Sequence, residues 1–459
     1  MAQPVGRRRA PYRRGAEVAL TIDRMAYGGR GVGRVDGYEV FVPDAAPGDR
    51  VRARLWRVKP GYAEADLIEV DAPSPLRTAP PCPHFGPCGG CAWQHLGYDV
   101  QVRAKESIVR ESLAHIAGLR DLAVRPILPA PAPWGYRNKM EFTFHPDAVL
   151  GLHRRGAFDR VVPIDACLIQ PDPANTILAE VRAWAAGSGL PRYDARTHTG
   201  LLRQAVIREG KRTGQFMVAL IAAAREVPGV DRLAGRLAEA EPRVASVLLG
   251  VNPGRSDGLP LAEVIVVAGR PFIEEQIAGL RFRIGLETFF QTNTAGAEQL
   301  VETVGAFAAL NGGETVYDLY AGVGTFTLPL ACRAGRVYGL EIGGSAVEAA
   351  RENAALNGVS NVEFFAGDVR RLLPEVLGRT RRPDVLVLDP PRSGAGSRVM
   401  RKIIAAAAPR IVYVSCNPTT LAPDLAELAG AGYAVRAVQP VDLFPHTHHV
   451  ECVVLLELS

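Results

Sequence analysis

The chain has 459 residues, of which 47% are hydrophobic and 22% charged, and its formal net charge is +5. This composition is typical of a folded globular protein and excludes a disordered or collagen-like chain. No apolar run approaches the roughly 18–20 residues of a membrane span. No apolar segment follows the N-terminal arginines, so we expect a cytosolic protein without a secretory signal. The length predicts two or three domains rather than one hydrophobic core.

The positive charge is concentrated at the N-terminus. Residues 1–60 contain 13 Lys and Arg against 6 Asp and Glu, whereas residues 61–459 contain 40 basic and 42 acidic residues. A basic segment attached to a near-neutral body predicts a module that binds a polyanion. A tail that serves solubility alone is the alternative that charge leaves open.

Two N-terminal segments differ in pattern. Residues 1–14 hold five arginines and no acid, which predicts a disordered basic arm. Residues 15–72 form short stretches of alternating polar and apolar residues, separated by glycines and by Pro47–Gly48. Short strands joined by tight turns predict a small β-barrel, a fold that often binds nucleic acid through a basic face.

The middle of the chain, residues 73–285, mixes both kinds of secondary structure. A proline-rich linker leads to an amphipathic helix predicted over 98–118, and further helices are predicted around 174–186 and 229–240. Apolar stretches typical of strands lie among them: MEFTFH, RQAVIRE, QFMVALIAA, SVLLGV and EVIVVAG. We therefore expect a central α+β domain.

Residues 286–459 show apolar strands that alternate with helices. Strands are predicted at TVYDLY, RVYGLEI, VEFFAGD, DVLVLDPP, RIVYVSCN and HVECVVLLEL, and helices near 294–309, 325–333, 345–356, 397–408 and 419–430. This alternation predicts a parallel, doubly wound sheet of the Rossmann-like α/β type.

A glycine-containing loop, Asp318-Leu-Tyr-Ala-Gly-Val-Gly-Thr-Phe, follows the first of these strands and opens a helix. Gly322 and Gly324 allow a tight turn and the close approach of a ligand, but Thr327 replaces the third glycine of dinucleotide-binding loops. The following strands end in the acids Glu341, Asp368 and Asp389. A single glycine turn, with acids at the ends of the strands that follow it, suits a ligand that contains adenosine but no diphosphate. S-adenosylmethionine (SAM) is such a ligand. Ordinary helix caps and strand-end turns are the alternative.

Cys416, in S-C-N-P, ends an apolar strand, and Glu451, in H-H-V-E-C-V-V, begins another. The carboxyl ends of strands in an α/β sheet form the crevice that holds substrates. A thiol and a carboxylate together suit methylation of uracil at C5. That carbon is too weakly nucleophilic until a thiolate has added to C6, and a base must afterwards remove the C5 proton. A buried strand-end thiol and a solvated carboxylate are the alternatives.

A group of cysteines stands in C-P-H-F-G-P-C-G-G-C, namely Cys82, Cys88 and Cys91. A disulfide framework is not expected in a large chain with seven cysteines. The spacing lacks the second C-x-x-C of a zinc ribbon, which favours an iron–sulfur cluster with Cys167 as the fourth ligand, zinc being the alternative. Cys332 and Cys452 lie in apolar segments and are expected in the core.

These segments together resemble the RNA 5-methyluridine (uracil-5) methyltransferases, in particular the ribosomal RNA members with an N-terminal TRAM domain and a [4Fe–4S] cluster. The resemblance extends from about residue 13 to the end and implies a class I SAM-dependent methyltransferase domain at the C-terminus. G-G-R-G-V-G-R and V-F-V-P-D-A-A-P-G-D match TRAM, and C-x5-C-x2-C with Cys167 matches the cluster. Y-R-N-K-M-E-F and T-G-L-L-R match the central domain, and F-F-Q-T-N, D-L-Y-A-G-V-G-T-F, L-D-P-P-R, S-C-N-P and H-V-E-C match the catalytic domain.

The resemblance implies a role for each matching position. Cys416 would be the nucleophile and Glu451 the base that removes the C5 proton. Asp389 would lie where SAM and uracil meet and accept a hydrogen bond from the uracil N–H. The other SAM-binding positions would be Gln291, Tyr320, Thr325, Glu341 and Asp368. The [4Fe–4S] cluster, held by Cys82, Cys88, Cys91 and Cys167, is expected to be structural.

The expected substrate is RNA from which a uridine is flipped out. The resemblance favours 23S ribosomal RNA, with transfer RNA as the alternative. Candidate RNA contacts are Trp134, Tyr136, Arg137, Lys139, Arg154 and Arg155. We expect a cytoplasmic monomer with no membrane association and no obligate protein partner.

Some positions depart from the family pattern, namely Ala321, Pro423, His446 and His448. None coincides with an implied catalytic position, so we expect them to alter RNA preference at most. The rival functions are a methyltransferase acting on amine groups, which would need no thiol, and a non-catalytic RNA-binding iron–sulfur protein. The presence of D-P-P-R together with Cys416 and Glu451 argues against both.

Overall fold

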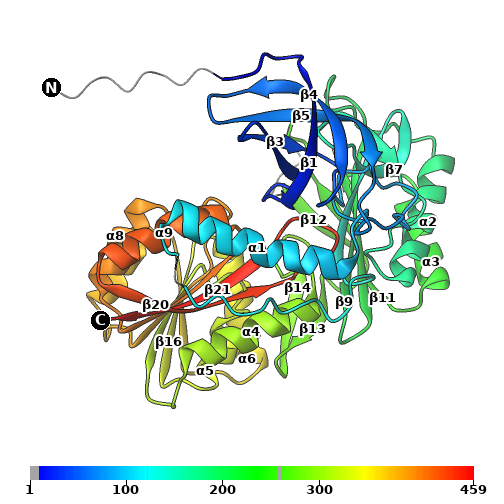
Figure 1. Cartoon of the computed structure of the whole chain (residues 1–459). Helices are drawn as coiled ribbons and strands as arrows, with labels where there is room; N and C mark the ends of the chain where they lie inside the picture. The colour runs from blue at the N-terminus through cyan, green and yellow to red at the C-terminus, as the bar shows by residue number, and fades with distance from the viewer. Residues whose placement is uncertain (1–9, 121, 257–260) are drawn as a thin grey trace.

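The computed structural model describes residues 10–120, 122–256 and 261–459. Figure 1 shows a barrel at the N-terminus, a central region and a C-terminal sheet flanked by helices. Residues 1–9, most of the predicted basic arm, lie outside the described residues, and Arg13 and Arg14 are exposed ahead of the barrel. In the described part of the chain no helix is both long enough and apolar enough to cross a membrane.

Short strands form the N-terminal barrel: β1 (Glu17–Met25), β2 (Gly31–Val35), β3 (Tyr38–Val42), β4 (Arg50–Val58) and β5 (Tyr62–Ala72). They close in the order β1-β2-β3-β5-β4. Alternate residues point inward, so that Val18, Leu20 and Ile22 of β1 are buried. Gly33 allows β2 to lie against β1, because a Cβ atom there would come within 2.0 Å of the Thr21 carbonyl oxygen.

The arginines on the outside of the barrel are largely paired with acids. Ion pairs join Arg54 to Glu17, Arg52 to Glu69 and Asp71, and Arg30 and Arg57 to Glu64. The pairs whose two side chains are both exposed add little stability, and Glu64 is the buried member of the others. All of them neutralise charge locally. The surface of the barrel is therefore less basic than its arginine content indicates.

The central sheet contains β6 (Lys139–His145), β7 (Ala148–His153), β8 (Val161–Pro163), β9 (Leu202–Gly210), β10 (Gln215–Ala222), β11 (Val244–Val251) and β12 (Glu263–Gly269). The strands lie in the order β12-β11-β10-β9-β6-β7-β8, with β10 and β11 parallel. The predicted helices of this region are confirmed as α2 (Asp172–Gly187) and α3 (Val230–Ala240), which cover one face. The hairpin of β13 (Phe272–Ile277) and β14 (Leu280–Gly285) packs against the other face.

The C-terminal sheet contains β15 (Thr315–Leu319), β16 (Arg336–Glu341), β17 (Val362–Ala366), β18 (Val385–Leu388), β19 (Arg410–Ser415), β20 (Tyr433–Val441) and β21 (Glu451–Leu458). Its order is β17-β16-β15-β18-β19-β21-β20, and β21 runs antiparallel to β19 and β20. One face carries α4 (Thr294–Ala308), α5 (Thr327–Ala331) and α6 (Gly344–Leu356). The other face carries α7 (Val369–Leu377), α8 (Ser397–Ala406) and α9 (Pro418–Gly430). The predicted doubly wound sheet is thus confirmed.

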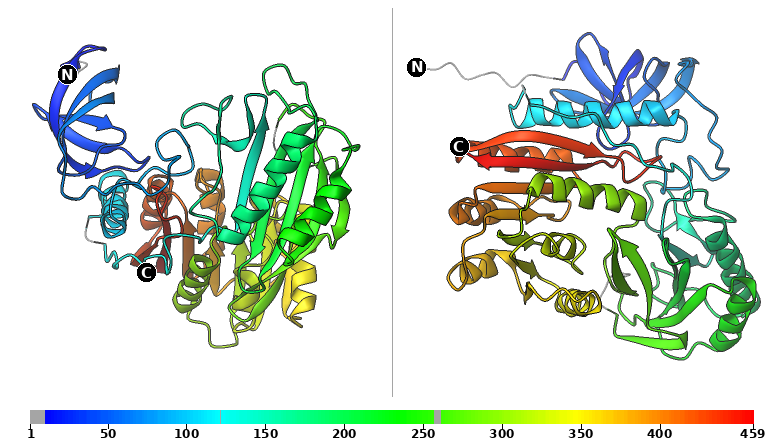
Figure 2. Two further views of the ribbon diagram at one scale, coloured as in Figure 1. Left: turned by 90° about the vertical axis from the view of Figure 1, so that its right-hand side faces the viewer. Right: turned by 90° about the horizontal axis from the view of Figure 1, so that it is seen from below.

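Helix α1 (Tyr98–Ile116) connects the barrel to the C-terminal domain. It packs on α9 and touches β1, and Figure 2 shows it between the barrel and the β20–β21 edge of the sheet. Val109 and Leu113 join the same hydrophobic core as α7, α8 and α9. Although α1 precedes the central domain in the sequence, it therefore belongs to the core of the C-terminal domain.

Several features of the C-terminal domain differ from the sequence-based expectation. The predicted strands omit β20, and the sheet is not parallel throughout, because β21 runs antiparallel to β19 and β20. The pattern does not predict α7, because this short helix follows Asp368 directly and contains Pro374. The prediction that Cys332 is a core residue is wrong. The side chain is exposed at the C-terminal cap of α5, where the short helix ends and the chain turns toward solvent. Cys452 is buried in β21, as expected.

Candidate active site

The ends of neighbouring strands bring the predicted catalytic residues together. Asp389 follows β18 and Cys416 follows β19, and these strands are parallel neighbours. Glu451 opens β21, whose antiparallel register with β19 sets Ser415 opposite Cys452. One step further along this register sets Cys416 beside Glu451. A thiol and a carboxylate from distant segments thus meet at the carboxyl edge of the parallel sheet.

Burial and like charge raise the pKa of each of these groups. Glu451 is 4% exposed, and burial followed by repulsion from Asp389 raises its pKa to about 8. Burial, and then the nearby Asp318 carboxylate, raises the pKa of Asp389 to about 7. Burial, and then Glu451, raises the pKa of Cys416 to about 12. A positive charge placed among these groups would lower all of these pKa values.

Arg392 is a cation that faces this acidic group and lowers the pKa of both Glu451 and Cys416. Its Nη2 atom lies 3.1 Å from Nδ1 of His449. Its backbone carbonyl accepts a hydrogen bond from Nδ2 of Asn417 at 3.2 Å, and Asn417 also caps the N-terminus of α9. The D-P-P-R and S-C-N-P segments are therefore fixed to one another.

The loop after β15 turns back sharply at Gly322 and Gly324, whose φ angles are +56° and +91°. Tyr320 has a φ of +69°, which is uncommon for a residue with a side chain and often found at functional sites. Glu341, at the end of β16, accepts hydrogen bonds from the amides of Gly322 at 3.0 Å and Gly343 at 2.8 Å. The predicted SAM-binding acid is thus tied to the glycine loop itself.

Two further predicted SAM-binding residues lie beside this loop. Asp368 caps α7 and binds Arg370, and the guanidinium lowers the pKa of this carboxyl to about 2. Burial, and then the Asp368 carboxylate, raises the pKa of Tyr320 to about 12. The structure therefore brings Tyr320, Glu341 and Asp368 together.

Gln291 and Thr325 are placed by separate segments. Gln291 precedes α4 and is half-buried, and its carbonyl accepts a hydrogen bond from Nδ2 of Asn138 in the central domain at 3.0 Å. Thr325 is half-buried in the turn before α5. Gln291 thus lies at the junction of the central and C-terminal domains.

Asp318 is a buried acid to which sequence reasoning assigned no role. It is 1% exposed within β15, and its Oδ2 atom accepts a hydrogen bond from the Thr327 hydroxyl. Its Oδ1 atom is buried and has no hydrogen-bond partner among the described residues. Burial, with a contribution from Glu341, raises its pKa to about 7. A carboxylate in an otherwise apolar strand, directly before the glycine loop, was the signal that could have identified it.

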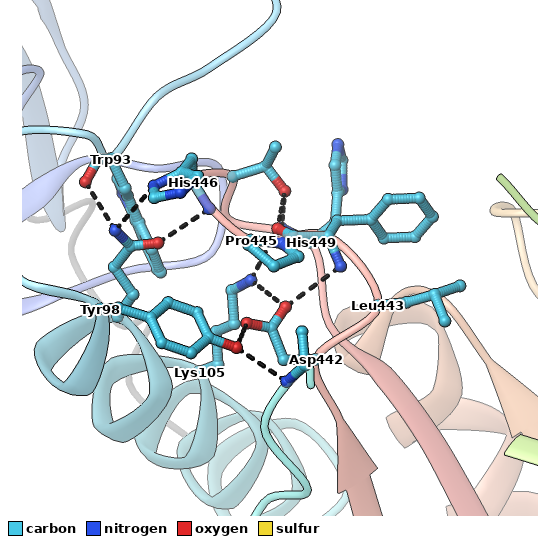
Figure 3. A network of polar contacts seen from close by, with 12 residues as sticks. Trp93, Tyr98, Lys105, Asp442, Leu443, Pro445, His446 and His449 are labelled. Atoms are coloured by element: carbon cyan, nitrogen blue, oxygen red, sulfur yellow. Dashed lines mark hydrogen bonds and ion pairs between the residues drawn. The ribbon is translucent and has the colours of Figure 1, made fainter. Parts of the chain in front are cut away.

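The loop that precedes Glu451, residues 442–450, is anchored by α1, as Figure 3 shows. Lys105 Nζ lies 2.6 Å from Asp442 Oδ1, and both side chains are fully buried. Tyr98 donates a hydrogen bond to the other carboxylate oxygen of Asp442 at 2.9 Å. A buried ion pair with satisfied neighbours fixes geometry more than it adds net stability. Helix α1 therefore determines the path of the chain that leads to Glu451.

His446, one of the departures from the family pattern, supports the same loop. Its backbone N–H donates to Gln101 at 2.8 Å, and its ring stacks on Trp134 with 3.7 Å between the ring centroids. Tyr136 is 5% exposed and donates its hydroxyl to the Pro445 carbonyl at 3.1 Å. The prediction that Tyr136 contacts RNA is therefore wrong, because its side chain is buried beneath this loop.

The four predicted cluster ligands, Cys82, Cys88, Cys91 and Cys167, line one cavity of about 580 Å³. All are free thiols. Burial, and then the other cysteines, raises the pKa of Cys91 to about 12 and that of Cys167 to about 11. Across the ranges that the structure describes, no set of three or more His, Cys, Asp or Glu side chains is arranged to hold a single metal ion. The same cavity is lined by the predicted RNA contacts Arg137, Lys139, Arg154 and Arg155.

Two family models match the chain. The model described as tRNA (Uracil-5-)-methyltransferase matches residues 261–459. The model described as TRAM domain matches residues 11–68, which cover most of the closed barrel. The N-terminal barrel is therefore a TRAM domain, and the C-terminal sheet is a methyltransferase domain.

Relatives and a solved structure match the whole chain. An uncharacterized RNA methyltransferase of Halalkalibacterium halodurans is 38% identical over 99% of this chain and 100% of its own length. One of Synechocystis sp. is 40% identical over 97% of this chain and 96% of its own length. The Pyrococcus abyssi tRNA (uracil-54, C5)-methyltransferase, solved in complex with S-adenosyl-L-homocysteine, is 28% identical with a TM-score of 0.77, covering 95% of this chain and 99% of that chain. By this likeness over its full length, the chain belongs to the RNA uracil-5-methyltransferase family, and it is a SAM-dependent RNA methyltransferase.

Proposed function

We propose that this enzyme forms 5-methyluridine in 23S ribosomal RNA through a covalent adduct between Cys416 and C6 of the base. The observation that carries the proposal is the β19–β21 register, which sets Cys416 beside Glu451 at the carboxyl edge of the sheet. An enzyme that methylates an amine would need neither group, because an amine nitrogen attacks the methyl donor directly. The pair therefore favours methylation of a carbon.

In the proposed mechanism the Cys416 thiolate adds to C6, and electrons of the C5–C6 double bond move toward O4 to give an enolate. C5 then attacks the SAM methyl group, whose bond to sulfur breaks to leave S-adenosylhomocysteine. Glu451 removes the proton from C5, and the returning electrons expel the thiolate from C6. Asp389 accepts a hydrogen bond from the uracil N3–H, which cytosine lacks.

The raised pKa values set a condition for this chemistry. In the unliganded site the Cys416 thiol is protonated at neutral pH, and so is a large share of Glu451. The sulfonium of SAM is positively charged, and a positive charge near these groups lowers their pKa values. We therefore expect SAM binding to precede adduct formation and to favour the thiolate.

We also propose that the loop after β15 holds SAM together with the acids at the following strand ends. Glu341 and Asp368 would accept hydrogen bonds from the ribose and adenine. Asp318 Oδ1 would accept one from the ammonium group, because this buried oxygen has no partner in the described part of the chain. The remaining proposed SAM contacts are Gln291, Tyr320, Thr325 and Asp389.

RNA would be held beside the catalytic edge as well as by the TRAM barrel. A hollow at the start of α7 and α8 is lined by the cations Arg370, Arg371, Arg398, Arg401 and Lys402. Within the described residues Arg370 pairs with Asp368, and the other four side chains are exposed and form no ion pair. Unpaired cations near the strand ends suit RNA phosphates that flank a flipped uridine.

We further propose that Cys82, Cys88, Cys91 and Cys167 hold a structural [4Fe–4S] cluster. Four thiols in one cavity supply the complete donor set for such a cluster. Positive iron among them would lower the raised pKa values of Cys91 and Cys167. Zinc is the alternative ion for the same four thiols.

Transfer RNA is the second candidate substrate, favoured by the likeness to the Pyrococcus abyssi tRNA enzyme. Ribosomal RNA is preferred because the barrel and the four cysteines match the ribosomal RNA members of the family. Unmodified transcripts of 23S rRNA and of tRNA can be incubated with the protein and methyl-labelled SAM, and the fragments analysed by mass spectrometry. We expect 5-methyluridine in 23S rRNA. If 5-methyluridine appears only in tRNA, the substrate is tRNA and not 23S rRNA. If methyl groups appear only on nitrogen atoms, the proposed methylation of uracil C5 is wrong.

A further inference from the structure

The turn between β1 and β2 of the TRAM barrel, residues 26–30, packs against the loop that precedes Glu451. Gly28 and Gly29 have φ angles of +93° and +86°, which permit the sharp turn. The carbonyl of Gly29 accepts a hydrogen bond from Nε1 of the fully buried Trp93 at 3.1 Å. A Cβ atom on Gly29 would lie 3.3 Å from Nδ1 of His448. A turn of the RNA-binding barrel is therefore fixed against the catalytic domain.

This turn places Tyr27 at the edge of the candidate active site. Its ring meets that of His448 edge-on, with 5.4 Å between the centroids. His448 in turn contacts the ring of His449 at 4.2 Å, and His449 lies 3.1 Å from Nη2 of Arg392. A continuous set of contacts thus leads from Tyr27 to Arg392 of the D-P-P-R segment.

The surroundings of the Tyr27 hydroxyl are those of the active site. Burial raises its pKa, the nearby Arg392 guanidinium lowers it, and Cys416 and Glu451 add smaller increases. The hydroxyl is therefore protonated at neutral pH and can act as a hydrogen-bond donor.

The same hydroxyl lacks a partner in the free enzyme. Its oxygen is buried and has no hydrogen-bond partner by distance and angle among the described residues. The Arg392 guanidinium, which lies beside it and lowers its pKa, carries only donors and cannot accept the hydroxyl proton. A buried donor without a partner costs free energy, so such groups in native proteins are normally satisfied by a ligand, a water or a substrate. Tyr27 is thus a donor in the catalytic cleft that awaits an acceptor.

We propose that Tyr27 is a catalytic residue contributed by the TRAM barrel, whose hydroxyl donates a hydrogen bond to a carbonyl oxygen of the flipped pyrimidine. The inference rests on the proposed function, in which negative charge develops on a pyrimidine carbonyl when the Cys416 thiolate adds to C6. A fixed donor aimed at an oxygen that gains charge stabilises the transition state more than the bound substrate. No proton is transferred from Tyr27, so the enolate collapses as described above.

The test compares Tyr27→Phe with Tyr12→Phe. Both remove one hydroxyl from the barrel, but the Tyr12 hydroxyl binds Asp36 on the exposed side of the barrel. Tyr27→Phe keeps the ring that packs on His448. We expect kcat for methylation of the transcript that the parental enzyme modifies to fall by about 10–100-fold. The dissociation constants for RNA and SAM should stay within about twofold, and Tyr12→Phe should match the parental enzyme.

Two results would overturn this inference. One is an unchanged kcat for Tyr27→Phe; the other is a loss confined to RNA affinity, which would make Tyr27 a packing or RNA-binding residue. Cys416→Ala serves as the reference for the proposed function. If Cys416→Ala remains active, the covalent mechanism fails whatever Tyr27→Phe does. If Cys416→Ala is inactive while Tyr27→Phe keeps the parental kcat, the role of Tyr27 alone fails.

Discussion

Two sites in this protein contain half-buried or buried thiols, among which Cys91, Cys167 and Cys416 have raised pKa values, and the surroundings of the two sites differ. At the strand ends, Cys416 lies among Glu451 and Asp389 and faces Arg392. In the other site, Cys82, Cys88, Cys91 and Cys167 share a cavity, and burial followed by the neighbouring thiols raises the pKa values of Cys91 and Cys167. The first site combines one thiol with carboxylates, whereas the second combines four thiols with arginine and lysine side chains.

The difference indicates what each site is built to receive. A lone thiol beside a carboxylate can form a bond, lose it and pass a proton to its neighbour, which is the requirement of covalent catalysis. Four thiols that line one cavity can share an iron-containing group. In both sites the pKa values of thiols are raised, so the thiols tend to stay protonated. In each site the cation that we propose, the SAM sulfonium in the first and iron in the second, would lower these pKa values.

Cys416→Ala should have the largest effect on the first site and none on the second. We expect methylation to fall by about 10⁴-fold or more, because the variant cannot activate C5. Cys332→Ala, which removes an exposed thiol from α5, is the matched control and should keep parental activity. The measurement is single-turnover methyl transfer from labelled SAM. Substantial methylation by Cys416→Ala would mean that the strand-end thiol is structural.

Glu451→Gln should block a later step of the same reaction. The thiolate can still add and C5 can still take the methyl group, but removal of the C5 proton should slow by about 10²–10⁴-fold. We therefore expect a protein–RNA adduct to accumulate with unmodified substrate, as a band of low mobility in a denaturing gel. If Glu451→Gln slows methylation by the same factor but no adduct accumulates, Glu451 acts earlier, in the activation of Cys416.

Cys167→Ser should affect the second site and leave the first intact. Protein purified without oxygen should contain iron and sulfide, and the variant should lose them together with thermal stability, because the proposed cluster would join the linker to the central domain. Cys416→Ala should retain the parental iron content. Elemental analysis decides the outcome, and zinc in place of iron and sulfide would identify a different metal centre.

Because the pKa of Glu451 is raised, the stability difference between Glu451→Gln and the parental protein should depend on pH. The folded pKa of Glu451 is about 8, against an ordinary value near 4.5. The folded protein therefore retains a proton that the unfolded chain releases between these values, and this contribution to stability is lost as the pH rises through about 8. Without SAM, Glu451→Gln should gain about 4 kcal/mol over the parental protein between about pH 5 and pH 9. Scanning calorimetry of both proteins across this pH range measures the difference in their stability. A difference that does not change with pH would show that Glu451 is not buried as described.

The smallest expected effect concerns RNA contact outside both sites. The variant R398Q/R401Q/K402Q removes three unpaired cations from α8. The comparison variant R379Q/R381Q/R382Q removes three cations from the segment after α7, of which Arg379 pairs with Glu375 and Arg381 with Asp384. We expect the first variant to weaken RNA binding by about 5–10-fold and to reduce the slope of log K against log salt by roughly 0.7–0.9 per lost phosphate contact. Equal weakening by both variants would indicate general electrostatic attraction without a docking surface.

Local patterns were sufficient to predict the parts of this molecule that depend on neighbours in the sequence. The alternation in residues 15–72 predicted the barrel. The apolar runs that end in D-P-P-R and S-C-N-P predicted strands whose carboxyl ends meet. The place of Cys416 followed from the same rule, since strand ends in a parallel sheet share one edge. Glu451 begins β21, and it reaches that edge only because β21 runs antiparallel to β19, which the pattern did not predict.

Contacts between distant segments could not be predicted in this way. No local pattern indicates that Lys105 of α1 pairs with Asp442, or that Tyr27 of the barrel reaches the D-P-P-R segment. His446 shows the same limit. Its sequence context indicated a loop residue, whereas its stacking on Trp134 depends on how the central and C-terminal domains pack. The burial of a polar group depends on tertiary packing. It determines which of these side chains support the loop before Glu451 and which can contact a substrate.

The most direct test of the account is the identity of the residue that bonds to RNA. The protein and SAM can be incubated with the substrate transcript made with 5-fluorouridine, whose C5 carries fluorine that a base cannot remove as a proton, so the adduct persists. Peptide mass spectrometry should then find methylated 5-fluorouridine on the Cys416 peptide, with no adduct when SAM is omitted. An adduct on another residue, or one formed equally by Cys416→Ala, would contradict the account.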